Sequence, residues 1–503
     1  MRHLIRGSLV LVAALVTAAA TPGAQRVPTI EPGTGPLVTG VSFVHMASSA
    51  DTETELEHIR AAGASSVRVF LRWSSIAPSG SVAPADFQAR NPADSNYRWQ
   101  LYDDDIRAIS EAGLKPIVTI SWAPVWAEGA EWASYPPGTY KPSPAALADF
   151  ATAVAKRYSG SFQGLPRVRY WSIWNEPNLT LFLNPQTENG KPFQPYWYRA
   201  MLNASAAAIH SVNAANIVIG GETAPYWQFQ QQKTAPISFM EAVLCISEKQ
   251  VRNKVTRKVE TIYKSACNQR AEFDVWAHHP YTEGGPTHRA AVHGNVSLGD
   301  MGALRAALNA AIRAKHVVSK RKIQLWINEF SWESNPPDSG GVPAQLEARW
   351  VSQALYGAWK DGVSLFMWYQ IRDDPISQTM AQSGLYYRSD AGIASDPAKP
   401  ALPAFRFPFI ASRQPKKMIF LWGRTPTSTA GTVLIERKSG AGWRRVKSLE
   451  ANRYGIFTAR IDAPARTTYL RARLADGSDQ SAPFSLKTPK ETWAGCVWGA
   501  PCV

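Results

Sequence analysis

The stretch RVRYWSIWNEPN, residues 167–178, decides how the rest of this sequence is interpreted. It begins as an apolar, aromatic run of the kind found in β-strands, and it stops at Asn175-Glu176-Pro177. Proline cannot donate a hydrogen bond to a sheet, so the proline marks the end of the strand and leaves Glu176 at the rim. A carboxylate in this place points to chemistry. The alternative is a glutamate that caps the helix that follows.

A second stretch, KIQLWINEFSW at residues 322–332, has the same form, because its apolar run also ends in Asn-Glu between aromatic residues. Counting back by twos from Glu329 reaches Ile327, Leu325 and Ile323. Alternation therefore predicts that the glutamate shares a face with branched apolar residues lining a closed barrel. Two rim carboxylates are the minimum needed for glycoside hydrolysis, since one protonates the leaving oxygen while the other attacks or directs water.

Eight strand-like runs lie between residues 37 and 370, and most of them precede a helical pattern. Their starts are about 30 to 55 residues apart, as expected of strand–loop–helix units. This alternation predicts the α/β class and a (β/α)₈ barrel. A doubly wound open sheet is the competing fold, but no glycine-rich phosphate loop follows the first run. The runs are Leu37–Met46, Ser66–Arg72, Lys115–Trp122, Arg167–Trp174, Asn216–Glu222, Glu272–Tyr281, Lys322–Glu329 and Val363–Gln370.

The chain of 503 residues exceeds one ordinary domain, so we expect one large and one small unit. The barrel is predicted for residues 25–412, after which the composition shifts. Short runs separated by turn residues over 413–490 predict a small antiparallel β-sandwich that either binds glycan or packs against the barrel. Residues 491–503 form a cysteine-containing tail.

Residues 1–24 have the form of a secretory signal peptide, with Arg2 and Arg6 ahead of an apolar centre from Leu9 to Ala20. An uncleaved anchor is the alternative, but the apolar run is short for crossing a bilayer. No other stretch is long enough to cross a membrane. We therefore expect a secreted, extracellular protein with no membrane span after cleavage.

The four cysteines fall into two local pairs, which suits an oxidising compartment. Cys245 and Cys267 lie in one insertion, and Cys496 and Cys502 lie close to the C-terminus. Pairing within each local pair is the expected arrangement, although three connectivities remain possible. The spacings match no zinc pattern.

The chain is basic, with a formal net charge of +15. Its lysines and arginines are scattered, and no nucleic-acid motif accompanies them, so we expect no nucleic-acid partner. A solvated basic surface is the first interpretation, and attraction to an anionic polysaccharide or cell wall is the second. The 19 tryptophans suit sugar stacking, although core packing explains most tryptophans in any protein.

The two glutamate motifs resemble those of the clan A retaining glycoside hydrolases, nearest to the cellulase-like family 5 and the xylosidase-like family 39. The resemblance covers roughly residues 37–410. It implies that Glu176, in Trp-Asn-Glu-Pro at the end of strand four, is the general acid and base. It implies that Glu329, at the end of strand seven, is the nucleophile. Phe70 stands where family 5 usually carries proline, so the family number stays open.

The same resemblance implies a set of substrate-binding residues. Arg68 is similar to the second-strand arginine that hydrogen-bonds the nucleophile, and Asn175 to the amide that holds the 2-hydroxyl of the sugar. His279 and Tyr281 are similar to the sixth-strand residues that line the same subsite. Read without their neighbours, Arg68 could be a salt-bridged barrel residue and His279 a core histidine.

Three further residues at strand ends are weaker candidates for the site. Trp368 looks like the ring beneath the reacting sugar, and Trp122 is a second aromatic candidate. Either tryptophan could instead belong to the core. Glu222 is a third rim carboxylate, beside two glycines, and it ranks below the other two because no asparagine precedes it.

These features predict a secreted retaining glycoside hydrolase that cleaves O-glycosidic bonds of a poly- or oligosaccharide by double displacement. No metal or organic cofactor is expected, and the protein is expected to act as a monomer. Two alternatives come from other classes. One is a non-catalytic glycan-binding protein on a barrel scaffold, and the other is a transglycosylase that uses the same pair of glutamates.

Overall fold

The computed structural model describes the chain from Pro28 to Pro489 with four internal gaps. The signal peptide predicted for residues 1–24 and the tail with Cys496 and Cys502 lie outside the described residues. The described ranges are 28–42, 49–225, 234–376, 381–462 and 468–489.

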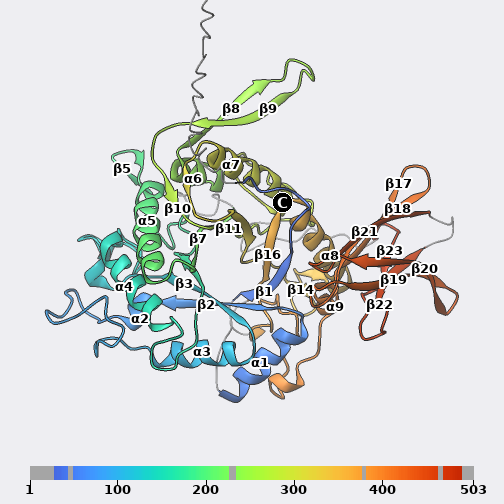
Figure 1. Cartoon of the computed structure of the whole chain (residues 1–503), viewed down its shortest axis with the longest axis horizontal. Coiled ribbons are helices and arrows are strands. Elements are labelled where there is room, and N and C mark those ends of the chain that lie inside the picture. The colour runs from blue at the N-terminus through green and yellow to red at the C-terminus, as the bar shows by residue number, and fades with distance from the viewer. Residues whose placement is uncertain (1–27, 43–48, 226–233, 377–380, 463–467, 490–503) are drawn as a thin grey trace, which may run out of the picture.

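Eight parallel strands close into a barrel in the order β1-β16-β13-β11-β7-β4-β3-β2 (Figure 1). Each strand pairs with the previous and the next barrel strand in the sequence, and the first, β1, pairs with the last, β16, to close the barrel. The predicted (β/α)₈ barrel is confirmed. Each predicted run overlaps one barrel strand, and most strands are shorter than their runs because the rim residues leave the ladder. The strands are β1 (Val38–Ser42), β2 (Ser66–Arg72), β3 (Lys115–Ser121), β4 (Tyr170–Ile173), β7 (Ile217–Thr223), β11 (Val275–His278), β13 (Gln324–Ile327) and β16 (Val363–Trp368).

Helices cover the outside of the barrel (Figure 1). Their starts follow local sequence signals; for example, the Ser143 hydroxyl accepts a hydrogen bond from the amide of Ala146 at 3.3 Å, and Pro144 occupies the first helical position. The helices are α1 (Ser49–Ala61), α2 (Trp73–Ile76), α3 (Gln100–Glu111), α4 (Pro144–Arg157), α5 (Gln194–Val212), α6 (Pro236–Leu244), α7 (Met301–Arg313), α8 (Ala344–Lys360) and α9 (Ala401–Arg406).

Apolar side chains fill the inside of the barrel, so it is a packed core rather than a pore. Burying each large side chain of this kind contributes about 1.5–3 kcal/mol. Toward the carboxyl ends of the strands, polar side chains such as Thr119 and Ser172 take their place, and a site can form there. The inner cluster consists of Ile117, Ile217, Ile219, Val275, Ala277, Trp326, Leu365 and Met367.

The face predicted for the residues before Glu329 is wrong. Ile323, Leu325 and Ile327 pack in the cluster between the strands and the helices, whereas Trp326 points into the barrel. Strand β13 ends at Ile327, so alternation does not extend to Glu329. The loop after the strand, rather than the strand itself, turns this carboxylate toward the barrel mouth.

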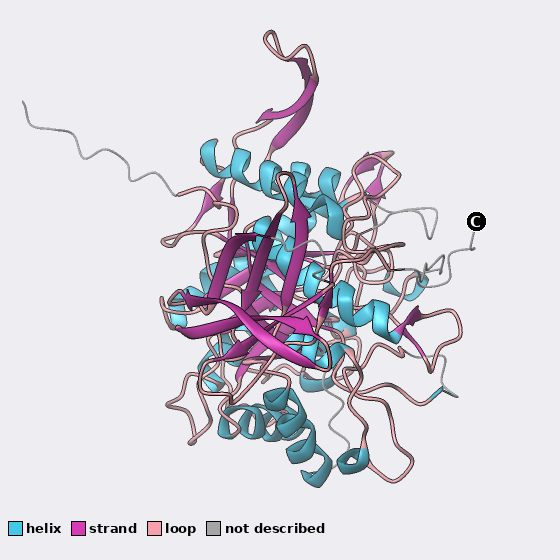
Figure 2. Ribbon diagram, turned by 90° about the vertical axis from the view of Figure 1, so that its right-hand side faces the viewer, coloured by secondary structure: helices cyan, strands magenta, loops and turns pink. Residues whose placement is uncertain are grey.

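The C-terminal region forms two antiparallel sheets, as the predicted β-sandwich requires (Figure 2). Strand β17 crosses the boundary expected at residues 412/413. The sandwich packs against α8, where the rings of Tyr356 and Trp359 lie 5.4 and 5.8 Å from that of Trp422. One sheet contains β17 (Phe409–Gln414), β18 (Met418–Arg424) and β21 (Ile456–Asp462); the other contains β20 (Gly442–Ala451), β19 (Gly431–Ser439), β22 (Tyr469–Leu474) and β23 (Phe484–Ser485).

Smaller strand pairs decorate the barrel. The largest is a hairpin of β8 (Ile246–Arg252) and β9 (Val259–Ser265), and a disulfide joins Cys245 to Cys267 at its base. This is one of the two local pairings expected from the sequence. The others are β5 (Thr187–Glu188) with β6 (Lys191–Pro192), β10 (Ala271–Glu272) with β12 (Val317–Val318), and β14 (Ser334–Asn335) with β15 (Val342–Pro343).

No helix within the described residues combines the length and the apolar composition that crossing a bilayer requires.

Candidate active site

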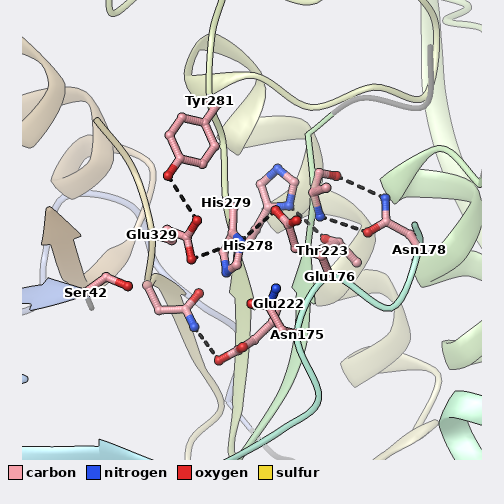
Figure 3. Close-up of polar contacts among 12 residues, drawn as sticks. Ser42, Asn175, Glu176, Asn178, Glu222, Thr223, His278, His279, Tyr281 and Glu329 are labelled. Atoms are coloured by element: carbon pink, nitrogen blue, oxygen red, sulfur yellow. Dashed lines mark hydrogen bonds and ion pairs between the residues drawn. The ribbon is translucent and has the colours of Figure 1, made fainter. Parts of the chain in front are cut away.

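The mouth of the barrel brings together polar side chains from the ends of several strands (Figure 3). Glu176 follows β4, Glu329 follows β13, and His279 directly follows β11. One oxygen of each carboxylate and one ring nitrogen of the histidine all lie within 4.8 Å of one another. Both glutamate side chains keep 14% of their surface exposed, whereas the histidine is fully buried. The two carboxylates therefore share one solvent-accessible site.

Unusual backbone conformations mark the same strand ends. Trp122, Trp174, Glu176 and Glu222 have φ angles of 57°, 71°, 38° and 48°. Positive φ in residues other than glycine costs about 1–3 kcal/mol and persists only where the surrounding structure enforces it. Such residues gather at functional sites. Here they turn the chain at the rim, which changes the direction that strand alternation would give to the side chains.

Glu329 is held by a buried cation and a phenol. The Arg68 guanidinium donates to its Oε2 at 2.5 Å, and the Tyr281 hydroxyl donates to its Oε1 at 3.0 Å. The two contacts fix the orientation of the carboxylate group. The structure thus brings together the three residues that the resemblance grouped around the nucleophile.

Arg68 is fully buried and contacts residues on several strands. Its Nη2 donates to Oδ1 of Asn175 at 2.8 Å, and its Nε donates to the Thr119 hydroxyl at 2.9 Å. The guanidinium also lies over the Phe70 ring, 4.3 Å from its centroid. The contact with Asn175 fixes the amide of that residue, with its oxygen turned toward the arginine.

Glu222 lies in the same network, although the sequence ranks it third among the rim carboxylates. It is fully buried and accepts hydrogen bonds from Arg68, Ser172 and Asn328. Burial raises its pKa, while the charge of Arg68 opposes that shift. With no exposed surface, Glu222 cannot reach a substrate directly.

His279 contacts Glu176 through its Nδ1, which lies 2.9 Å from Oε1 of the glutamate. The pKa of this histidine is lowered to about 3, mainly by burial; the charge of Glu329 opposes the shift, and that of Arg68 adds to it. The ring is therefore neutral at physiological pH. A neutral imidazole beside Glu176 can hold the orientation of that carboxyl group without adding a charge.

The two predicted tryptophans differ in exposure. Trp368 is fully buried and donates its indole N–H to the carbonyl of Ser383 at 2.7 Å, so its ring offers no surface on which a sugar could stack. Strand β16 ends at this residue, and the partly exposed ring beside it belongs to Tyr369. Trp122 is partly exposed, with the Arg72 guanidinium 4.7 Å from its centroid. Only Trp122 keeps the surface that its predicted role needs.

Four residues of the site escaped the sequence analysis. Tyr369 directly follows Trp368, and the sequence analysis assigned the exposed ring to the tryptophan, one residue too early. Thr119 and Ser172 are polar residues at inward positions of β3 and β4, a pattern that could have identified them. Asn328 precedes Glu329 as Asn175 precedes Glu176, and this repeated Asn-Glu was the available signal.

The spacing of the acidic residues and the histidine raises the question of whether this site binds a divalent metal ion. Glu176, His279 and Glu329 form the one group within the described residues with metal-ligand spacing. However, the Arg68 guanidinium contacts Glu329 at 2.5 Å and would repel a cation there. The residues present therefore suit a neutral ligand between two carboxylates better than a metal ion.

Two buried histidines are expected to make the fold sensitive to acid. The pKa values of His278 and His279 are lowered to about 3, mainly by burial, from 6.5. Below about pH 6.5, these two histidines therefore bind protons in the unfolded chain but stay neutral in the native chain. Each histidine should lower the free energy of unfolding by about 1.4 kcal/mol per pH unit as pH falls from about 6.5 toward 3. Urea unfolding at about pH 7 and pH 5 measures this loss.

His278→Gln is the variant that isolates one of the two contributions. His278 contacts the Thr223 hydroxyl at 2.7 Å and the Val296 carbonyl at 2.9 Å, and glutamine can replace these hydrogen bonds. The variant should lose less stability between the two pH values than the wild type does. An equal loss in both proteins would contradict the assignment.

No family model matches this sequence, and no curated protein matches it. The structure is similar to a family 39 glycoside hydrolase from Bacteroides cellulosilyticus WH2, with 17% identity, 87% of this chain and 81% of that chain covered, and a TM-score of 0.48. It is similar to a GH39 β-xylosidase from Caulobacter crescentus, with 15% identity, coverage of 81% and 84%, and a TM-score of 0.48. It is also similar to a GH30 endoxylanase from Clostridium papyrosolvens C71, with 11% identity, 87% of this chain and 96% of that chain covered, and a TM-score of 0.44.

Proposed function

We propose that this protein is a retaining glycoside hydrolase that cleaves O-glycosidic bonds of a poly- or oligosaccharide. The observation that carries the proposal is the approach of Glu176 and Glu329 to within 4.8 Å of each other at the mouth of a barrel. Retaining enzymes place their carboxyl groups ~5 Å apart, whereas inverting enzymes separate them by ~6.5–9.5 Å to admit a water molecule.

In the first step, the ionised Glu329 attacks the anomeric carbon and forms a covalent glycosyl ester. Glu176 donates its proton to the glycosidic oxygen, which leaves as an alcohol. Arg68 and Tyr281 support the role of Glu329, since their hydrogen bonds hold one carboxylate oxygen each and orient the pair. Asn175 precedes the acid in the chain and is oriented by Arg68, which supports its proposed contact with the sugar.

In the second step, Glu176 accepts a proton from water, and the resulting hydroxide attacks the anomeric carbon. The ester bond to Glu329 breaks and restores the carboxylate, so the product keeps the configuration of the substrate. His279 supports both steps because its neutral ring contacts Glu176 without competing for charge. The partly exposed rings of Trp122 and Tyr369 are the candidates for sugar contacts.

We place the enzyme outside the cell. The signal-peptide pattern of residues 1–24 supports export. The disulfide between Cys245 and Cys267 also supports it, because such bonds persist in oxidising compartments.

The test is hydrolysis of a panel of aryl β-glycosides and of glucans, xylans, mannans, galactans and arabinosides. Proton NMR of the first product formed should give the anomer of the substrate. The inverted anomer would contradict the retaining mechanism, and transfer to an added alcohol without hydrolysis would indicate a transglycosylase. Binding of glycans without turnover of any of them would indicate a non-catalytic protein.

Chelation of divalent metals is expected to leave this activity unchanged. The reaction uses two carboxylates and no bound cation, and Arg68 already supplies the positive charge beside Glu329. Initial rates after dialysis against EDTA should equal those of untreated enzyme. A loss that zinc or calcium restores would contradict the proposed mechanism and favour a metal bound by Glu176, His279 and Glu329.

A further inference from the structure

Glu222 has no role in the two chemical steps, yet it is a central residue of the network beneath them. It is the penultimate residue of β7, beside Gly221, and its side chain has no exposed surface. Figure 3 draws it in the same cluster as Glu176 and Glu329. A buried carboxylate is costly unless it is paired and hydrogen-bonded, so its retention calls for an explanation.

Hydrogen-bond donors surround the Glu222 carboxylate. Its Oε2 accepts from Arg68, and its Oε1 accepts from Ser172 and Asn328 and, at 3.5 Å, from Thr119. The guanidinium and the asparagine amide nitrogen can only donate. These partners favour the ionised carboxylate against the cost of burial.

Glu222 is linked to Glu329 by two routes. Arg68 contacts both carboxylates, so one buried positive charge is divided between two negative ones. Asn328 donates to Glu222 and directly precedes Glu329 in the chain. A change at Glu222 therefore alters both the charge and the position of the backbone at Glu329.

Glu222 is also linked to Glu176. The Glu222 carbonyl accepts a hydrogen bond from the Glu176 amide at 2.9 Å. This contact fixes the backbone at the point where Glu176 adopts its positive φ of 38°. The other titratable groups that face Glu222 are Arg68, Glu329 and Tyr198, whose hydroxyl accepts from the amide of Gly221 at 2.8 Å.

We propose that Glu222 is a positioning residue that sets the geometry of both catalytic glutamates and, by sharing Arg68, limits the stabilisation of the Glu329 carboxylate. The inference rests on the proposed hydrolase function. A nucleophile paired with the whole charge of Arg68 would be more strongly stabilised and would attack more slowly. Division of that charge between Glu222 and Glu329 leaves Glu329 the more reactive nucleophile.

Glu222→Gln tests the proposal, because glutamine keeps the shape and removes the charge. Arg68 is then left with Glu329 as its carboxylate partner. We expect kcat to fall by ~100-fold with KM changed little, and the acidic limb of the kcat/KM profile to move to lower pH. Glu222→Asp keeps the charge but shortens the side chain, so it should lower kcat without moving that limb.

Asp103→Asn is the matched control. Asp103 is also a buried carboxylate paired with a buried arginine, since Arg157 donates to it at 2.8 Å, but the pair lies between α3 and α4. This variant should lower the melting temperature and leave kcat and the acidic limb as in the wild type. If Glu222→Gln changes only the melting temperature, or leaves the acidic limb in place, the proposal is wrong.

Two outcomes separate this inference from the function on which it rests. A wild-type protein without activity on any glycoside contradicts the proposed function and not the placement of Glu222. An active wild type with an unaltered Glu222→Gln profile contradicts the inference alone. If the glutamine variant does not fold, Glu222→Asp decides, and a wild-type kcat in that variant overturns the proposal.

A second, independent observation concerns the hairpin arm, defined as residues 246–265. Figures 1 and 2 show β8 and β9 extending away from the helices around the barrel. A two-stranded hairpin is marginally stable by itself, and here the disulfide between Cys245 and Cys267 ties its two ends together. The fold therefore maintains a projecting element that the barrel does not need for closure.

The hairpin arm carries a concentrated positive charge. Its two acidic residues are engaged, Glu248 with His293 at 3.2 Å and Glu260 with Asn253 at 2.7 Å. Its cations are exposed, and none forms an ion pair with a carboxylate within the described ranges of the chain. They are Lys249, Arg252, Lys254, Arg257, Lys258 and Lys264.

We infer that the hairpin arm binds an acidic polysaccharide through these cations. Their charge complements a polymer with repeated carboxylates, and their spread over both faces and the tip suits an extended chain. The tip exposes Val255, by 90%, and carries no aromatic residue. Insertion into a membrane or stacking on nucleic-acid bases would call for such rings.

Retention on immobilised polygalacturonate tests this inference. The variant Lys254→Gln/Arg257→Gln/Lys258→Gln should elute at lower salt than the wild type. The control Arg444→Gln/Arg445→Gln/Lys447→Gln removes the same charge from exposed positions of β20 and should elute like the wild type. Equal losses in the two variants would mean that only net charge matters and would overturn the inference. Binding to phosphatidylglycerol vesicles but not to polygalacturonate would overturn it in favour of a membrane.

Discussion

Glu329→Gln should lower kcat/KM by at least ~10⁴-fold on any substrate that the wild type hydrolyses. The loss corresponds to about 5 kcal/mol of transition-state stabilisation. Tyr281 and Arg68 contact the two oxygens of Glu329 at 3.0 and 2.5 Å. The carbonyl oxygen of glutamine can still accept from Arg68, and its amide nitrogen can donate to the Tyr281 oxygen. Glutamine cannot form the glycosyl ester, because its amide is a poor nucleophile. The measurement is initial-rate kinetics on an activated aryl glycoside.

Two controls separate lost chemistry from lost structure. The melting temperature of Glu329→Gln should stay close to that of the wild type, because Arg68 keeps Glu222 as a charged partner. Glu329→Gly in the presence of azide should regain turnover, since the anion can enter the space of the side chain, and the product should be a glycosyl azide of inverted configuration. Activity of Glu329→Gln within tenfold of the wild type would remove this residue from the nucleophile role.

The sequence predicted the barrel well because its signals repeat. Each of eight apolar runs lies in a strand–helix unit of similar length, so an error in one run does not change the fold. Strand β2 (Ser66–Arg72) was predicted to the residue. The rims were predicted less well, because strand ends are defined by hydrogen bonds to neighbours that the sequence of one strand does not contain.

Side-chain direction at the rims is the main feature that the sequence could not supply. Alternation assigned Glu329 to the face of Leu325 and Ile327, yet those two residues face the helices. Glu222 was recognised as a rim carboxylate but not as the buried partner of Arg68. Its positive φ of 48° turns the chain, and nothing in the local sequence requires that angle.

The tryptophans illustrate a related limit. Trp368 and Tyr369 are adjacent, and either could have been the exposed ring at the end of β16. The structure buries the tryptophan against Phe330 and Phe405 and leaves the tyrosine partly exposed. Packing against residues far away in the sequence decides which ring is exposed, so the local sequence pattern cannot predict it.

Glu176→Ala should affect substrates unequally, and this inequality is what identifies an acid. Glycosides with poor leaving groups need the proton that Glu176 supplies and should lose ~10³–10⁴-fold in kcat/KM, within the range of general acid catalysis. Dinitrophenyl glycosides leave without a proton, so their first step should change by less than about tenfold. The basic limb of the pH profile should also disappear, because no acid remains to be deprotonated. The measurement compares kcat/KM across a series of aryl leaving groups in both proteins.

The matched control for Glu176→Ala is Glu128→Ala. Glu128 lies in the loop after β3, where its carboxylate accepts from the amides of Gly138 and Tyr140 at 3.0 and 2.8 Å. Loss of these contacts should change stability and leave the dependence on leaving group as in the wild type. With azide, Glu176→Ala should form a glycosyl azide of retained configuration, the opposite of the product from Glu329→Gly, because the anion now attacks the covalent intermediate. The same anomer from both variants would mean that the two carboxylates do not act on opposite faces of the sugar.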